Sequence, residues 1–163
     1  MSKHPHYRPA GYAAVTPWII TDDTARLIGF LSAAFGAEEM ARVPNADGSI
    51  GHAEARIGDA MVMMFDRPKG WPETPAFLRL YVENADLAYA AALKAGATAI
   101  TEVTHLAFGD RVGRVCDPLG NIWWLQTHIE DVEPAEMARR WSDPEWAAAM
   151  QYVQDSLTQA FGA

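Results

Sequence analysis

The hydrophobic and polar positions of this chain give the same order of elements twice. Each copy begins with an apolar strand-like run and continues with a predicted helix that ends at a glycine, Gly36 or Gly96. The apolar residues of the first helix, Leu27, Leu31 and Phe35, recur at i, i+4 and i+8, and the second helix carries Leu87 and Leu93. Three further strand-like runs follow each helix. The predicted strands are 13–20, 38–43, 50–57 and 60–65 in the first half, and 77–82, 97–104, 111–116 and 122–128 in the second.

Turn chemistry supports this division of the chain. Asp-Gly and Gly-Asp pairs separate the strands of the first half, and Asp117-Pro118-Leu119-Gly120 separates the last two strands of the second. The predicted organisation is therefore a flexible lead (1–11), a first β-α-β-β-β module (12–65), a proline-rich linker (66–76), a second module (77–130) and a helical tail (131–163).

The tail carries its own helix signal. Ser142-Asp143-Pro144-Glu145 is a strong helix start, and Trp146, Met150, Val153 and Leu157 then form an apolar stripe at helical spacing. The stripe predicts a helix that docks on its own domain or on a second subunit.

Composition and charge narrow the classes of function. The chain has 163 residues and a net charge of −8, which disfavours nucleic acid and anionic membranes as partners. It shows neither a signal-peptide core nor an apolar run of membrane-spanning length, so we expect a cytoplasmic protein. Its single cysteine, Cys116, excludes an internal disulfide, and an inert buried thiol is the default expectation for it. His4 and His6 are expected to belong to a polar, disordered end.

Seven short segments carry a family resemblance. They are Val15-Thr16-Pro17-Trp18, Ala34-Phe35-Gly36-Ala37-Glu38-Glu39, Gly51-His52-Ala53-Glu54, Arg56-Ile57-Gly58-Asp59, Leu80-Tyr81-Val82, Gly109-Asp110-Arg111 and Thr127-His128-Ile129-Glu130-Asp131. With the Asp-Pro-x-Gly turn and its aromatic-rich strand, they resemble the PhnB-like branch of the glyoxalase/bleomycin-resistance/dioxygenase (vicinal oxygen chelate) superfamily. The resemblance implies an α+β fold in which two β-α-β-β-β modules form a curled mixed sheet, here with a C-terminal helical extension. It also implies a homodimer.

The resemblance further implies where a metal would bind. Metal-using relatives supply one ligand, usually His or Glu, from each of four strands. The matching positions here are Thr16, Phe77, Trp124 and one of Met61, Val62, Met63 and Met64. Phenyl, indole and thioether groups do not supply the donors that a divalent ion requires. We therefore expect no metal and no other cofactor.

Strand alternation predicts which side chains share a face with those positions. On the third strand, His52, Glu54 and Arg56 alternate with Ala53, Ala55 and Ile57, which are expected to pack under a helix. The predicted ligand-binding set is Thr16, Trp18, His52, Glu54, Arg56, Met63, Phe77, Arg79, Tyr81, Arg114, Trp124 and Gln126. These residues predict a cavity with aromatic walls and a few polar groups. Alternatively, the polar residues form a mutually hydrogen-bonded trio, and the aromatic residues form a core.

Two classes of function follow from this set. The first is a metal-independent protein that binds or sequesters a small organic molecule, as bleomycin-resistance relatives do. The second is an enzyme of the lyase or isomerase type, with Glu54 as base and His52 as its partner. A metal-dependent glyoxalase or dioxygenase is the other enzymatic form, and the residues at the four metal-ligand positions argue against it. The positive charge of Arg56 on the same face would lower the pKa of Glu54 and so work against its role as a base. A catalytically silent dimeric module is a third reading.

Overall fold

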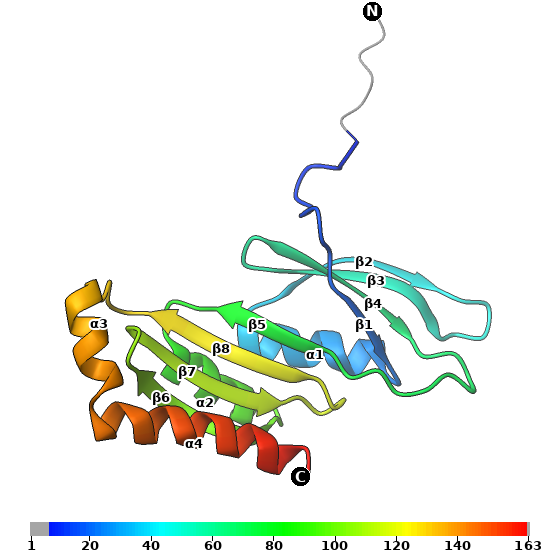
Figure 1. Cartoon of the computed structure of the whole chain (residues 1–163). Coiled ribbons are helices and arrows are strands. Elements are labelled where there is room, and N and C mark those ends of the chain that lie inside the picture. The colour runs from blue at the N-terminus through cyan, green and yellow to red at the C-terminus, as the bar shows by residue number, and fades with distance from the viewer. Residues whose placement is uncertain (1–6, 163) are drawn as a thin grey trace, which may run out of the picture. The chain divides into compact units, whose positions relative to one another are not determined.

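The computed structural model describes residues 7–162, and the chain divides into two compact units, Met1–Ala76 and Phe77–Ala163. His4 and His6, with the rest of the predicted lead before Tyr7, lie outside the described residues. The first unit contains β1 (Trp18–Thr21), α1 (Thr24–Phe35), β2 (Glu38–Pro44), β3 (Ile50–Ile57) and β4 (Ala60–Asp66) (Figure 1). Its sheet has the order β1-β4-β3-β2, with β1 parallel to β4 and the other pairs antiparallel.

The second unit repeats this topology and extends it. It contains β5 (Phe77–Tyr81), α2 (Ala85–Lys94), β6 (Thr98–Leu106), β7 (Asp110–Cys116), β8 (Ile122–His128), α3 (Pro134–Trp141) and α4 (Pro144–Ala160). The sheet order is β5-β8-β7-β6, with β5 parallel to β8. The predicted fold class is thus confirmed, with four strands hydrogen-bonded in each unit.

The same device starts the helix of each unit. In the first unit, the Asp66 carboxylate at the end of β4 accepts hydrogen bonds from the backbone N–H of Thr24 (2.8 Å) and of Ile50 (2.7 Å). In the second, the Thr127 hydroxyl on β8 accepts a bond from the Ala85 N–H (2.8 Å). Both side chains satisfy N–H groups that a helix or strand start leaves without a partner.

Two elements differ from the sequence prediction. The first strand was predicted over 13–20 but covers only Trp18–Thr21. Pro17 has no N–H to give to a ladder, and the Thr16 hydroxyl bonds locally to the Ala13 carbonyl (3.4 Å). Helix α3 was not predicted as an element of its own, although Pro134 at its start and the basic residues of its last turn are typical helix signals.

In the first unit, one face of the sheet is closed and the other is left open. Ala53, Ala55 and Ile57 on β3 are buried on the face that α1 covers, as alternation predicted. His52 and Glu54 lie on the opposite face and are only half-buried. A β-α-β-β-β unit has one helix for two sheet faces, so this second face is available for contacts with chain segments or ligands.

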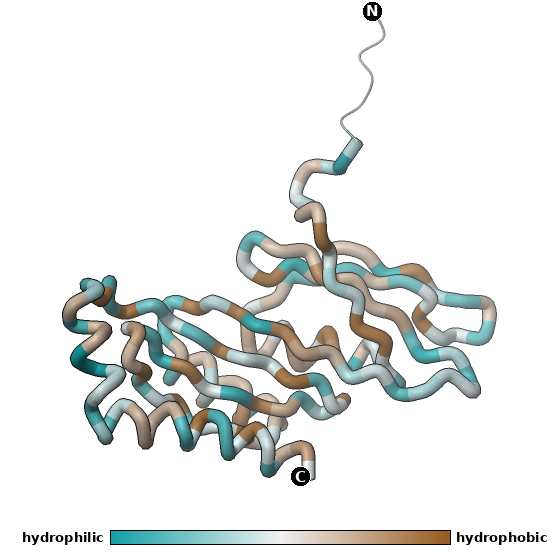
Figure 2. Tube along the Cα trace, in the orientation of Figure 1, coloured by the Kyte–Doolittle hydropathy of each residue, from teal (hydrophilic) through white to brown (hydrophobic). Residues whose placement is uncertain are grey.

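In the second unit, helices lie on both faces of the sheet. Helix α2 packs on β6, β7 and β8, while α4 packs chiefly on β6 (Figure 1). Val153 of α4 is buried with Leu106 and Val112, and Met150 and Trp124 pack against this cluster. Apolar and polar residues alternate along α4 (Figure 2). The tail stripe is therefore docked on its own domain, and the homodimer, which was argued partly from that stripe, stays a prediction.

No helix within residues 7–162 combines the length and the apolar character needed to cross a membrane.

The Asp117 turn is a polar centre inside the second unit. The Asp117 carboxylate is buried and accepts four hydrogen bonds, from the N–H groups of Leu119 and Asn121, from Asn121 Nδ2 and from Trp123 Nε1, at 2.8–3.0 Å. The turn thus fixes where β7 ends and β8 begins, because one charged group satisfies all of these donors.

Replacing this carboxylate is expected to be costly. Asp117→Ala leaves buried donors of Asn121 and Trp123 without an acceptor and should lower the free energy of unfolding by about 3 kcal/mol or more. Urea denaturation measures the loss. The matched control is Asp59→Ala in the exposed β3–β4 turn, which should change stability by about 0.5 kcal/mol or less. Equal losses in the two variants would contradict the role given to Asp117.

Candidate functional site

A row of side chains crosses all four strands of the second sheet. Arg79 on β5 is paired with Trp124 on β8, Trp124 with Arg114 on β7, and Arg114 with Thr101 on β6. Directly paired residues point to the same face of a sheet. Because Trp124 packs against the cluster that contains Val153, this is the face that α4 covers.

Trp124 lies at the centre of the row, and its indole is only half-buried. The guanidinium carbon of Arg114 lies 3.9 Å from the ring centroid and that of Arg79 lies 4.5 Å away, so a cation from each neighbouring strand contacts the ring. Phe77 approaches edge-on, with ring centroids 6.2 Å apart. The indole Nε1 is buried and has no hydrogen-bond partner among residues 7–162.

Arg114 is buried, with 3% of its surface exposed, and holds α4 against the sheet. Its Nη1 donates to the Val153 carbonyl (2.6 Å) and to the Thr101 hydroxyl (3.1 Å). The Thr101 hydroxyl also bonds to the Ser156 hydroxyl of α4 (2.7 Å). Burial, and secondly the charge of Arg79, lower the pKa of Arg114 to about 10.

A pocket of about 250 Å³ opens beside this row. It is lined by Arg79, Leu106, Phe108, Arg114, Trp124, Gln126, Met150, Val153 and Gln154. Strand residues supply both arginines and Trp124, the β6–β7 turn supplies Phe108, and α4 supplies an apolar wall and one amide. The volume is somewhat below the usual range for ligand pockets, about 300–1,000 Å³, so the pocket suits a small molecule or one part of a larger one.

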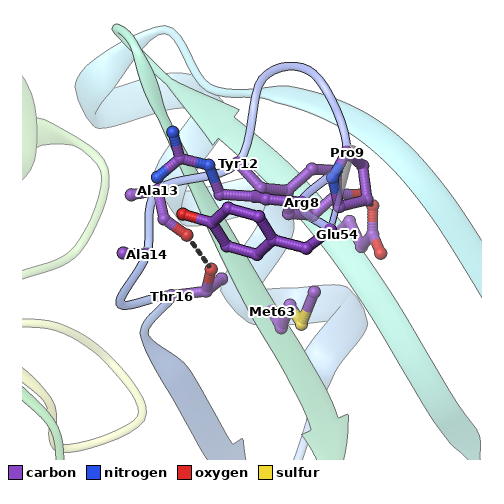
Figure 3. Close-up of a pocket in the computed structure, with 9 residues that line it drawn as sticks. Arg8, Pro9, Tyr12, Ala13, Ala14, Thr16, Glu54 and Met63 are labelled. Carbon is purple, nitrogen blue, oxygen red and sulfur yellow. Dashed lines mark hydrogen bonds between the residues drawn. The ribbon is translucent and has the colours of Figure 1, made fainter. Parts of the chain in front are cut away.

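The first unit has an equivalent row with different chemistry. Trp18 on β1 is paired with Met63 on β4, and Met63 with Glu54 on β3. Here the chain before β1, rather than a helix, lies on the open face. A hollow of about 480 Å³ is lined by Tyr7, Arg8, Pro9, Tyr12, Ala13, Ala14, Thr16, Glu54 and Met63 (Figure 3).

Glu54 is already engaged on both carboxylate oxygens. Tyr12 donates its hydroxyl hydrogen to one oxygen (2.5 Å), and His52 Nε2 lies 2.9 Å from the other. The hydrogen bond from Tyr12, and secondly that from His52, lower the pKa of Glu54. Arg56 contacts Glu38 instead (2.5 Å). Of the predicted hydrogen-bonded trio, only His52 and Glu54 are therefore bonded to each other. A general base at neutral pH needs a raised carboxylate pKa, and this geometry produces the opposite.

Comparisons with known proteins identify the family. The family model for the Glyoxalase/Bleomycin resistance protein/Dioxygenase superfamily matches residues 10–125. The chain belongs to this superfamily. Uncharacterized proteins of Mycobacterium bovis and Mycobacterium tuberculosis are 36% identical to it over 135 residues, which are 76% of this chain and 89% and 79% of those proteins. The membership of the superfamily that was predicted from the sequence is confirmed.

Solved structures share the superfamily fold. TioX from Micromonospora is 24% identical, with a TM-score of 0.61, and the match covers 72% of this chain and 99% of TioX. The PhnB protein from Bacillus cereus is 16% identical, with a TM-score of 0.57 and coverage of 71% and 99%. At these identities the likeness concerns the fold alone.

The residues at the superfamily's metal positions do not fit a divalent cation. Thr16, Met63, Phe77 and Trp124 offer a single hydroxyl and a thioether as donors, and the Thr16 hydroxyl already bonds to Ala13. Around Trp124 the nearest charges are two guanidiniums, which repel a cation. Within residues 7–162, no three His, Cys, Asp or Glu side chains are grouped as a metal site.

The structure brings some of the predicted site residues together within each unit. Thr16, Glu54 and Met63 line the hollow of the first unit, with His52 bonded to Glu54 and Trp18 packed on His52 at a centroid distance of 5.5 Å. Arg79, Arg114, Trp124 and Gln126 line the pocket of the second. Arg56, Phe77 and Tyr81 are exposed and line neither.

Sequence reasoning missed other lining residues. Tyr12 was assigned to the start of the first module without a role, yet its hydroxyl bonds to Glu54. No periodicity marks a loop residue of this kind. Met150 and Val153 were recognised as part of the tail stripe, but the stripe alone did not show which face of which sheet it covers.

His128 is linked to the pocket residue Gln126 through Asp110. The Asp110 carboxylate contacts His128 Nδ1 at 2.6 Å and also accepts a bond from Gln126 Nε2. His128 Nε2 lies 3.0 Å from Asp131. The hydrogen bond to Asp110, followed by that to Asp131, raises the pKa of His128 above its ordinary value of 6.5.

The raised pKa of His128 predicts how the stability of the folded protein changes with pH. A histidine whose pKa is raised on folding stabilises the protein fully below pH 6.5, and the contribution disappears as the pH rises through the folded-state pKa. NMR titration of the His128 ring should give a midpoint above 6.5. Asp110→Asn should lower that midpoint more than the control Asp131→Asn does. A wild-type midpoint at or below 6.5 would refute the arrangement.

Proposed function

We propose that this protein binds a small, flat organic molecule without a metal, and that the ligand contacts the indole of Trp124 in the pocket of the second unit. The observation that carries this proposal is the half-buried Trp124 ring, which forms one wall of a pocket that also contains polar groups. Aromatic walls with a few polar groups are typical of sites for organic ligands. Sequestration of the ligand, rather than its conversion, is the proposed role.

The polar groups of the first unit support binding over catalysis. Both oxygens of Glu54 are engaged, and its pKa is lowered rather than raised. These features favour a structural or contacting role for His52 and Glu54. The runner-up function, a lyase or isomerase that uses Glu54 as base, would first have to break the hydrogen bond from Tyr12.

The proposal is tested by screening compounds of one to three fused rings, in neutral, anionic and cationic forms, for saturable quenching of tryptophan fluorescence. At least one compound should bind with a dissociation constant below about 1 mM, which corresponds to roughly 4 kcal/mol. Turnover of a compound that binds would instead favour the enzyme alternative. A screen with no binder would remove the proposed function.

The proposal makes a prediction about the metal content of the protein. Protein purified without chelators and then dialysed should contain far less than one Zn²⁺, Ni²⁺, Mn²⁺ or Fe²⁺ per chain, because Thr16, Met63, Phe77 and Trp124 do not form a ligand set. Elemental analysis checks this. Close to one equivalent of any of these metals would contradict the proposal.

The Trp124 side chain should contact the ligand as a wall of the pocket and should not be a major part of the hydrophobic core. Trp124→Ala should abolish binding and cost less stability than the neighbouring Trp123→Ala. Trp123 is 2% exposed, so its truncation should cost about 3–5 kcal/mol, as for a buried large aromatic side chain. Urea denaturation and ligand titration of the two variants separate the roles. If Trp124→Ala is as destabilising as Trp123→Ala, the indole is part of the core.

A further inference from the structure

The pocket in the second unit contains positive charge that the protein does not neutralise. Neither Arg79 nor Arg114 forms an ion pair within residues 7–162, and no acidic residue lines the pocket. Six other arginines within these residues are paired with carboxylates. The pairs are Arg42 with Glu39, Arg56 with Glu38, Arg67 with Asp22, Arg111 with Asp86, Arg139 with Glu136 and Arg140 with Glu130.

Hydrogen-bond donors without acceptors accompany this charge. Arg114 Nε and Trp124 Nε1 are both buried and lack a partner among the described residues. A buried donor without an acceptor destabilises the protein, and more so when it carries charge. A guanidinium presents its donors as a fork, which matches the paired oxygens of a carboxylate.

We infer that the ligand of this pocket is a flat aromatic acid, whose anionic oxygen atoms are bound by Arg79 and Arg114 while its ring contacts Trp124. This inference rests on the proposed function and adds the chemical class of the ligand. The acid group supplies acceptors for the unpartnered donors and charge for the unpaired guanidiniums. Because the whole chain carries a charge of −8, which repels anions at long range, the attraction must come from this local pair.

Electrostatics favour an anion at this point. Burial, followed by the proximity of Arg79, lowers the pKa of Arg114 to about 10. Keeping Arg114 charged in this buried position therefore costs free energy. An anion in contact with the guanidiniums removes part of that cost, because opposite charges stabilise each other strongly where water is excluded.

A purely structural role for Arg114 explains only part of the geometry. Its Nη1 bonds to Val153 and Thr101 account for the attachment of α4. They do not account for Arg114 Nε or for Arg79. Arg79 lies exposed on the edge strand β5 and makes no hydrogen bond within the described part of the chain, so it is the better residue to mutate.

The test uses a matched pair of probes, 2-naphthoate and its neutral analogue 2-naphthamide, titrated calorimetrically into the full-length protein. The acid should bind about tenfold more tightly than the amide, since a charge-assisted hydrogen bond exceeds a neutral one by roughly 1.4 kcal/mol. Arg79→Gln should remove most of that preference. Arg26→Gln, which removes the same charge from an exposed position on α1, should leave it intact.

Each outcome has a defined meaning. Equal affinity for the acid and the amide, with both lost in Trp124→Ala, would overturn the inference and leave the proposed function in place. A preference for the acid that survives Arg79→Gln, with a thermal melt showing the variant folded, would also overturn it. Failure of both probes to bind would overturn the inference, while the proposed function would still be decided by the wider screen of fused-ring compounds.

Discussion

The structure depends on one constraint, which is that a β-sheet has two faces and each β-α-β-β-β unit has one helix to cover them. The helix takes the face with small apolar residues, such as Ala53 and Ala55 on β3. Whatever covers the other face decides what the unit can do. In the first unit the chain before β1 contacts that face through Tyr12 and Glu54. In the second unit helix α4 packs on it and forms one wall of a pocket.

The two units have therefore diverged at equivalent positions. By register, Trp18, Met63 and Glu54 correspond to Arg79, Trp124 and Arg114. The carboxylate of the first row is satisfied by neighbours within its own unit, whereas the guanidiniums of the second row have no acid partner in the described residues. A satisfied group stabilises structure, and an unsatisfied one has capacity for a ligand. The second unit is for this reason the better candidate for binding.

The sequence predicted the repeat, the strands after each helix and the tail helix, because each of these has a local periodicity or cap. Strand alternation also predicted that Ala53 and Ala55 pack under a helix. It did not predict the pairing of Arg56 with Glu38 or of Tyr12 with Glu54, since these contacts join residues whose partners are set by register and by loop conformation. Nor did it predict that α4 closes the face around Trp124, because an apolar stripe does not specify the surface on which it docks.

The central claim is that the face of the second sheet opposite α2 is a ligand site with Trp124 as its wall. The most direct test follows the indole N–H resonances of Trp124 and Trp123 by NMR during titration with a compound that quenches the protein's fluorescence. Trp123 lies on the other face and donates its Nε1 hydrogen to Asp117, so it serves as an internal control. The account predicts a saturable shift of the Trp124 resonance while that of Trp123 stays in place. Saturable binding that leaves the Trp124 resonance unmoved would contradict the claim.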